Sequence, residues 1–259
     1  MKSESLSTWK NHWERTGAAN NNFKDAFFLM DQIKMEYLLP LLPKFTKRTL
    51  EIGAGSGRLS RFLARKGYIT YCLDYSIEAL TYARTHYERE GTQGVYVLAG
   101  AEHLPFNDNS FDVVFSTGLL EHYEDPMPII LEMVRVLKNG GLFYSDIVPK
   151  KFSLLRSLDF VRPLLGREWN PMFEMKFTKQ DIIKFLENAD LQDVTVFPAA
   201  IFPPRIPVLR GYSLVPFCES LIARALTPIL KYLDETLIAE YLGFYYFAYG
   251  YKLGEQRNN

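Results

Sequence analysis

The sequence predicts an α/β protein built on a doubly wound, mostly parallel sheet of about seven strands. Short apolar and β-branched runs alternate with helical patterns through the first two-thirds of the chain. A glycine-rich turn joins the first of these runs to the first helical pattern. The 259 residues are enough to bury a full hydrophobic core.

Each element follows from a local pattern. Strands are expected at about Arg48–Ile52, Tyr68–Asp74, Gly94–Ala99, Phe111–Thr117, Gly141–Val148, Leu191–Phe197 and Phe244–Lys252. Helices are expected at about Gly57–Lys66, Ser76–Glu90, Pro126–Leu137 and Thr178–Ala189. The Ser76 hydroxyl can accept from the unpaired amides of a first turn, which makes it a good N-cap. The run from Lys138 to Gly141 is expected to end the third helix with a glycine cap.

The whole chain, residues 1–259, is expected to form one domain. An N-terminal helical cap occupies residues 1–45, and the core follows at residues 46–150. The remaining half, residues 151–259, contains a helical insertion at residues 198–242, before the last strand. The insertion begins with a proline-rich loop, and Thr227-Pro228 is expected to start its helix.

Composition excludes several classes of protein. The 30 basic residues balance the 30 acidic ones, and we find no sizeable basic patch, so a nucleic-acid partner is not expected. The only two cysteines, Cys72 and Cys218, lie far apart, which fits a reducing compartment. The start is polar, and no run reaches the roughly 18 apolar residues of a membrane span. We therefore expect a cytoplasmic protein, with peripheral membrane contact left open and its oligomeric state undetermined.

The strongest motif is the glycine-rich run from Leu50 to Leu59, with glycines at Gly53, Gly55 and Gly57. An apolar strand leads into these glycines, and a helix opens directly behind them. Glycine allows a sharp turn and the close approach of a ligand. The first amides of the following helix can then meet a polar or anionic group.

Asp74 follows the second strand. At the carboxyl end of that strand a carboxylate can accept from both hydroxyls of a ribose. Strand ends and helix starts meet at one sheet edge, so Asp74 and the glycine loop are expected to share a cleft. The alternative is that Asp74 only caps a helix or turn.

A dinucleotide is one ligand that suits such a cleft. A dinucleotide fingerprint requires Gly-x-Gly-x-x-Gly, but the position three past Gly55 is Arg58. The glycine spacing therefore disfavours a dinucleotide.

The run Glu51-Ile52-Gly53-x-Gly55-x-Gly57 resembles the first motif of class I S-adenosylmethionine-dependent methyltransferases. Further segments resemble the small-molecule branch that includes ubiquinone-biosynthesis C-methyltransferases (the methyltransferase type 11-like group): Ala101–Phe106, Ser110–Val114, Leu120–His122 with Asp125-Pro126, and Arg135–Gly141. The resemblance covers about residues 48–150. It implies a Rossmann-like methyltransferase fold with an antiparallel last strand, and S-adenosylmethionine as cofactor.

The resemblance also implies roles for individual residues. Asp74 would bind the ribose hydroxyls and Tyr75 would pack on the adenine, whose edge Ala101 and Glu102 would flank. The methionine part would lie against the glycine loop, and the cleft floor near the sulfonium would follow the fourth strand; the residues implied are Glu51, Gly53, Ala54, Gly55, Gly57, Arg58, Thr117, Gly118 and Leu119. Relatives often have an aspartate just before Ala101, where this chain has Gly100, and Glu102 could replace it.

Methyl transfer needs a base only where the acceptor arrives protonated. His122 follows the fourth strand and is of the side-chain type that titrates near neutrality, so it is the first candidate, with Glu121 second. Alternatively, His122 is a loop residue that hydrogen-bonds to the backbone. His12 lies between Trp9 and Trp13, which are expected to pack on the domain. The four histidines show no ligand spacing, and we expect no metal.

Acceptor specificity is expected outside the core pattern. The segments are the region up to about Phe45, residues 150–176, and the insertion, and the last two are apolar and aromatic for loops. A lid that packs on the domain is one interpretation. The other is a surface for a lipid-like acceptor, with Arg205, Arg210 and Arg224 meeting head groups.

The sequence thus predicts methyl transfer to a small or lipid-like organic acceptor at oxygen, carbon or nitrogen. One alternative is a non-catalytic S-adenosylmethionine-binding or scaffold protein, favoured by Gly100. The other is a nucleotide-dependent oxidoreductase, disfavoured by the glycine spacing and by the lack of an obvious Tyr-x-x-x-Lys pair.

Overall fold

The computed structural model describes residues 24–158, 173–203, 221–222 and 225–254. The strands are β1 (Arg48–Ile52), β2 (Ile69–Asp74), β3 (Val95–Leu98), β4 (Phe111–Thr117), β5 (Leu137–Ile147), β6 (Leu191–Ala199) and β7 (Tyr245–Lys252). The α-helices are α2 (Lys24–Leu41), α3 (Arg58–Arg65), α4 (Ile77–Arg89), α5 (Met127–Val136), α6 (Lys179–Asn188) and α8 (Leu237–Leu242). Short 3-10 turns are η1 (Leu120–His122), η2 (Leu154–Arg156) and η5 (Lys231–Leu233).

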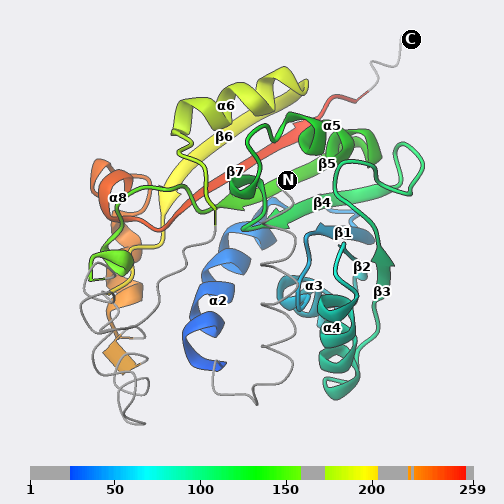
Figure 1. Cartoon of the computed structure of the whole chain (residues 1–259), viewed down its shortest axis with the longest axis horizontal. Helices are drawn as coiled ribbons and strands as arrows, with labels where there is room; N and C mark the ends of the chain where they lie inside the picture. Colours follow the sequence, from blue (N-terminus) through cyan, green and yellow to red (C-terminus); the bar gives the residue numbers. More distant parts are fainter. Residues whose placement is uncertain (1–23, 159–172, 204–220, 223–224, 255–259) are drawn as a thin grey trace.

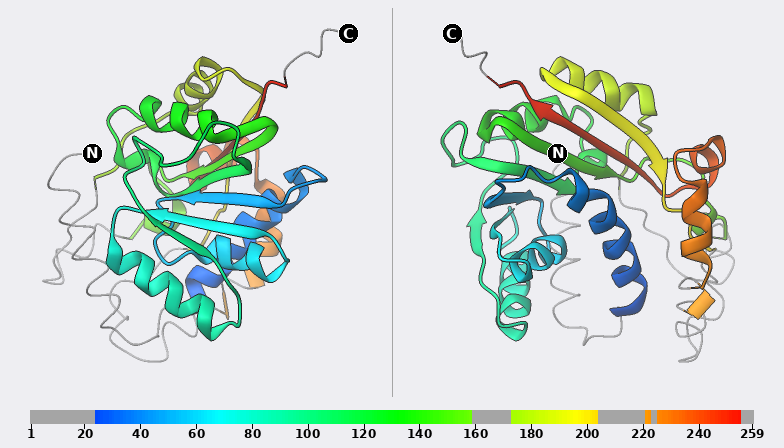
Figure 2. Two further views of the ribbon diagram at one scale, coloured as in Figure 1. Left: turned by 90° about the vertical axis from the view of Figure 1, so that its right-hand side faces the viewer. Right: turned by 180° about the vertical axis from the view of Figure 1, so that it is seen from behind.

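The seven strands form one sheet in the order β3-β2-β1-β4-β5-β7-β6. β1 to β5 pair with one another in parallel, whereas β7 is antiparallel to both β5 and β6. Helices α5 and α6 cover one face, and α2, α3 and α4 cover the other (Figures 1 and 2). The predicted doubly wound fold and its antiparallel last strand are therefore confirmed.

Burial on both faces explains the continuous apolar runs of the central strands. Along β4, Val113 and Phe115 pack with helices α2 and α3, while Val114 packs with α5 and α6. Successive strand residues point to opposite faces, and a strand covered on both sides is apolar throughout. The third predicted helix and the fifth strand differ from expectation, because the strand already begins at Leu137. The chain accommodates Lys138 to Gly141 as an irregularity in the pairing with β4, and Gly140 adopts φ +72° there.

The helix of the insertion also differs from prediction. Residues 225 and 226 are already helical, so Thr227-Pro228 lies inside this helix and does not start it. The expectation relied on local capping chemistry alone, and residues 221 and 222 are helical as well.

Helix α2, the described part of the N-terminal cap, is fastened to the sheet by a buried ion pair. Lys34 Nζ lies 2.7 Å from Asp146 Oδ1, and the two side chains are 4% and 0% exposed. Asp146 raises the pKa of Lys34 against the opposing effect of burial, so the lysine stays charged. The Lys34 carbonyl also accepts a hydrogen bond from the Tyr144 hydroxyl. Because Asp146 stands near the carboxyl end of β5, the pair ties α2 to the edge where the glycine loop lies.

Removing one partner of this pair should be costly. Lys34→Met leaves the Asp146 carboxylate buried without its cation, and we expect a loss of about 3–5 kcal/mol in the free energy of unfolding. Lys34→Met combined with Asp146→Leu should recover part of that loss, because no charge is left unpaired. Lys231→Met, which breaks an exposed ion pair with Glu36, is the control and should cost at most about 1 kcal/mol. Urea denaturation measures all three, and equal losses in Lys34→Met and the control would contradict the assignment.

Candidate functional site

The glycine loop between β1 and α3 has the geometry that only glycine adopts readily. Gly53, Gly55 and Gly57 have φ of +64°, +53° and +62°. A Cβ on Gly53 would stand 2.8 Å from Cδ1 of Leu119, so the segment after β4 lies directly against the loop. The Ala54 amide donates to the Leu73 carbonyl at 3.0 Å, which ties the loop to β2. The loop is thus a narrow backbone turn between the ends of three strands.

Asp74 meets this loop, as the topology predicts. Its Oδ2 accepts from the Gly55 amide at 2.8 Å, and its Oδ1 accepts from the Ser76 amide at 2.9 Å. The side chain is buried, and burial raises its pKa although these backbone donors oppose the rise. The Ser76 hydroxyl in turn accepts from the Ala79 amide and caps α4, as expected. Asp74 therefore fastens the loop while each oxygen retains capacity to accept from a ligand hydroxyl. Tyr75 beside it is half-buried.

Glu51 lies beneath the loop at the end of β1. Its Oε2 accepts from the Ser60 amide at 3.1 Å, and Thr117 Oγ1 lies 3.5 Å from Oε1. Burial raises the pKa of Glu51 to about 7. Glu51 thus links the first turn of α3 to the end of β4.

In the segment after β3, Gly100 stands where relatives often have an aspartate, and a neighbouring residue supplies a carboxylate. Ala101 is buried and Glu102 is half-buried. A Cβ on Gly100 would stand 3.1 Å from Oε2 of Glu102. The Glu102 carboxylate therefore occupies space beside Gly100, as required if it replaces the missing aspartate.

The loop after β4 carries the two base candidates. Gly118 has φ +64°, and its amide donates to the Asp146 carbonyl at 2.9 Å. Glu121 Oε1 accepts from the Val148 amide at 3.1 Å, and burial raises the pKa of Glu121 to about 8. His122 is buried, with Nδ1 2.6 Å from the Phe173 carbonyl. Burial lowers the pKa of His122, so its imidazole is neutral at pH 7.

Arg58, one of the predicted cofactor-binding residues, is the first residue of α3. Its Nε lies 3.5 Å from Asp31 Oδ2 on α2. Together with Lys34 and Asp146, these residues form a buried and half-buried set of charges that sequence reasoning missed. Such a set joins three elements remote in sequence, so no local pattern could have revealed it.

The next features concern metal ligands, membrane-spanning helices and the predicted residues that lie outside the described ranges. Within the described ranges, no group of three or more His, Cys, Asp or Glu side chains is arranged to hold a metal ion. In the same ranges, no helix has the length and apolar character needed to cross a membrane. Several predicted residues lie outside the described part of the chain: Trp9, His12, Trp13, Arg205, Arg210, Cys218 and Arg224.

A family profile described as "Methyltransferase domain" matches residues 50–145. The ubiquinone biosynthesis O-methyltransferase of Aliivibrio fischeri (strain MJ11) is 37% identical over 105 residues, which are 40% of this chain and 45% of that protein. The match thus spans less than half the length of this relative. The protein of the same name from Vibrio vulnificus (strain YJ016) is 31% identical over 167 residues, 62% of this chain and 71% of that one.

Solved structures share the fold at low identity. A possible histamine N-methyltransferase of Thermotoga maritima has a TM-score of 0.58 at 18% identity, over 96% of this chain and 98% of that one. An N-methyltransferase of Haemonchus contortus, in complex with phosphomonomethylethanolamine and S-adenosylhomocysteine, has a TM-score of 0.59 at 20% identity, over 85% and 52%. These likenesses establish the fold alone.

Motif, sheet order and relatives agree. The chain belongs to the class I S-adenosylmethionine-dependent methyltransferase family and resembles the ubiquinone-biosynthesis enzymes within it.

Proposed function

We propose that this protein transfers a methyl group from S-adenosylmethionine to a small or lipid-like organic acceptor, at oxygen, carbon or nitrogen. The observation that carries the proposal is the glycine loop, with Asp74 bonded to its Gly55 amide and Leu119 closing on Gly53. The loop offers backbone space with no Cβ, a helix start and a carboxylate at one edge of the sheet. These are the groups needed for a ligand with an amino-acid end and a ribose.

The residues present fit the cofactor. Asp74 would accept from the ribose hydroxyls, with Tyr75 along the adenine and Ala101 and Glu102 at its edge. The glycine loop, Glu51 and the segment Thr117–Leu119 would hold the methionine end. The bound cofactor supplies an activated methyl group on a sulfonium. The protein's own contribution is then to orient the acceptor and exclude water, because alignment alone can provide much of the rate.

His122 is our proposed base for an acceptor that arrives protonated, with Glu121 as the second candidate. The lowered pKa of His122 keeps the imidazole neutral and able to accept a proton at pH 7. Its contact with the Phe173 carbonyl orients the ring. The same contact is what a purely structural histidine would make, so the two roles need a functional test.

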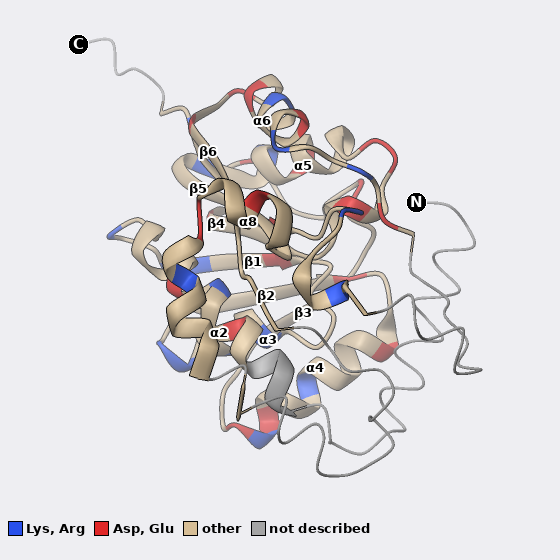
Figure 3. Cartoon of the chain, turned by 90° about the vertical axis from the view of Figure 1, so that its left-hand side faces the viewer, with Lys and Arg blue, Asp and Glu red and all other residues tan. Residues whose placement is uncertain are grey.

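The half of the chain after residue 150 supports a lipid-like acceptor and peripheral membrane contact. Around the insertion, large apolar side chains face solvent: Leu221, Ile222, Leu226, Ile229, Tyr232, Leu237, Ile238 and Tyr241. We call these eight residues the insertion surface. The described residues of its first helix, 221–222 and 225–230, are uncharged, and most of this region is tan in Figure 3. Monomeric proteins rarely expose apolar side chains in such numbers on one segment without a partner.

Cofactor binding is tested by calorimetric titration with S-adenosylmethionine and S-adenosylhomocysteine, beside NADH. We expect micromolar binding of the first two and none of NADH. Asp74→Ala should weaken binding by about tenfold or more, because it removes charged acceptors for two hydroxyls. Glu88→Ala, which removes an exposed carboxylate from α4, is the control and should bind as the wild type does. Absence of binding to both adenosyl ligands would refute the proposal.

The base is tested with His122→Asn once an acceptor is found. Asparagine can still donate to the Phe173 carbonyl but cannot accept a proton near neutral pH. We expect kcat to fall about 100-fold or more with little change in KM or melting temperature. The wild-type kcat should hold below pH 6.5 and fall only as pH drops through the lowered pKa of His122, and the variant should lose this step. An unchanged kcat would show that His122 is structural.

Membrane contact is tested by co-sedimentation with phosphatidylcholine vesicles containing an anionic lipid. Replacing Ile229, Tyr232 and Leu237 with serine should reduce the bound fraction several-fold, because each buried apolar side chain contributes about 1.5–3 kcal/mol. Phe45→Ser is the control, since Phe45 is as exposed as Tyr232, at 88%, but lies between α2 and β1. Equal binding of the triple variant and the wild type would remove the insertion surface from consideration.

A further inference from the structure

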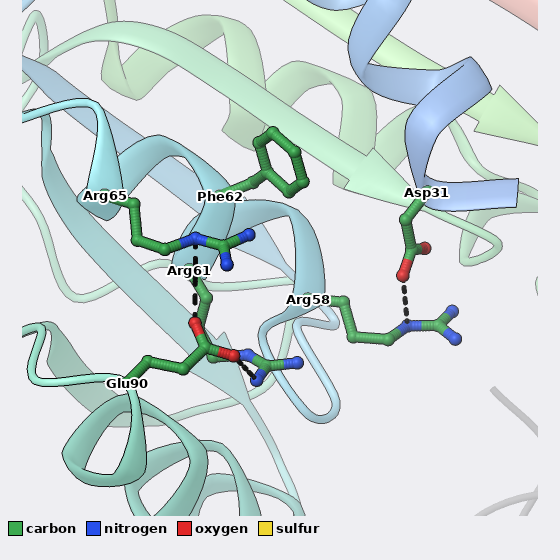
Figure 4. Close-up of a pocket in the computed structure, with 6 residues that line it drawn as sticks. All are labelled: Asp31, Arg58, Arg61, Phe62, Arg65 and Glu90. Atoms are coloured by element: carbon green, nitrogen blue, oxygen red, sulfur yellow. Dashed lines mark hydrogen bonds and ion pairs between the residues drawn. The ribbon is translucent and has the colours of Figure 1, made fainter. Parts of the chain in front are cut away.

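A second polar site lies on α3, outside the loop that Gly53 to Gly57 form. A cavity of about 130 Å³ lies there between α2, α3 and the end of α4. Figure 4 shows the residues that line it. Helix α3 supplies Arg58, Arg61, Phe62 and Arg65. Asp31 of α2 and Glu90, which caps the end of α4, complete the lining.

The three arginines follow from the spacing within α3. Positions i, i+3 and i+7 lie on one face of a helix, so Arg58, Arg61 and Arg65 form a row over two turns. The opposite face supplies Leu59 and Leu63 to the core. The row therefore faces away from the core. The side chains of Arg58, Arg61 and Arg65 are 32%, 13% and 46% exposed.

The described residues that line the cavity carry more positive than negative charge. Three guanidinium groups face two carboxylates, and Glu90 is shared between two of the arginines. The shortest of the ion pairs among them joins Arg61 Nη1 to Glu90 Oε1 at 2.5 Å. Arg65 Nε lies 3.8 Å from Glu90 Oε2, and Arg58 Nε lies 3.5 Å from Asp31 Oδ2. The Arg65 guanidinium thus makes a long contact with Glu90 that a stronger acceptor can replace.

The row is also held in place before any ligand arrives. Arg65 lies over the Phe62 ring, with Cζ 4.6 Å from its centroid, and Glu90 holds Arg61. The Nε of Arg61 is buried and has no hydrogen-bond partner in the described part of the chain. A buried donor without an acceptor is uncommon and often marks an ion or water that belongs to the site. The cavity offers the volume of about four waters, which is enough for a phosphate group.

We propose that this arginine row binds a soluble phosphate or phosphate monoester at a site separate from the cofactor cleft. Arginine forks match phosphate oxygens in bidentate geometry, and the excess positive charge attracts an anion. The row runs away from the glycine loop. Arg65, the last residue of α3, is about 10 Å along the helix axis from Arg58. The site does not depend on the proposed methyl transfer.

The test is calorimetric titration of inorganic phosphate and of glycerol 3-phosphate at constant ionic strength, with and without saturating S-adenosylhomocysteine. We expect saturable binding that persists with that ligand present. Arg65→Gln should weaken binding by about fivefold or more, because it removes a charge-assisted contact from an exposed position. Arg61→Lys, which keeps the charge but not the fork, should also weaken it. Arg84→Gln on α4 removes an exposed arginine from a simple surface pair and should bind as the wild type does.

Three outcomes would overturn the proposal. The first is the absence of saturable binding, and the second is an equal effect of Arg65→Gln and Arg84→Gln. The third is loss of phosphate binding when S-adenosylhomocysteine is added, which would place the anion in the cofactor cleft. Vesicles containing phosphatidic acid distinguish the source of the phosphate. Binding to these vesicles without binding of either soluble anion would assign the row to a lipid head group and contradict a soluble ligand.

Discussion

The site depends on one constraint, the left-handed backbone at three alternating glycines and the carboxylate that holds it. Gly53, Gly55 and Gly57 all have positive φ, and the Gly55 amide is fixed by Asp74. A Cβ on Gly53 would clash with the Leu119 side chain, so Leu119 packs directly against the backbone of the loop. Because Asp74 ends β2 and Leu119 follows β4, the parallel order of these strands with β1 brings the three parts together.

Buried charge is the second determinant. Lys34 and Asp146 lie in the interior, and Glu51 and Glu121 have pKa values raised to about 7 and about 8 by burial. Buried ionisable groups of this kind gather at functional sites more often than elsewhere. Here Glu51, Glu121 and Asp146 gather near the carboxyl ends of β1, β4 and β5, whereas the arginine row lies on the outer face of α3.

Much of the fold was predictable because its signals are local. The seven strands follow from apolar runs of the right length, and the caps at Ser76 and Thr178 follow from side chains that accept from first-turn amides. The start of β5 was missed because Gly140 is equally suited to a helix cap and to a strand irregularity. Thr227-Pro228 was wrongly expected to start a helix, because its capping chemistry is local and does not show that residues 225 and 226 are already helical. The Asp74 contact was predictable from topology, but the pairing of Lys34 with Asp146 joins residues 112 positions apart and leaves no periodic trace.

Helix α3 shows how one short element serves two surfaces. Its first turn follows the glycine loop, and Leu59 and Leu63 fix its inner face to the sheet. That packing decides where the remaining positions point, since a helix with one face buried presents the other to solvent. Arg58 stands at the junction, because it directly follows Gly57 and pairs with Asp31 of α2. Its backbone thus continues the glycine loop, while its side chain belongs to the arginine row on the outer face. The loop and the outer row are therefore placed by the same packing of Leu59 and Leu63, although their lining residues differ.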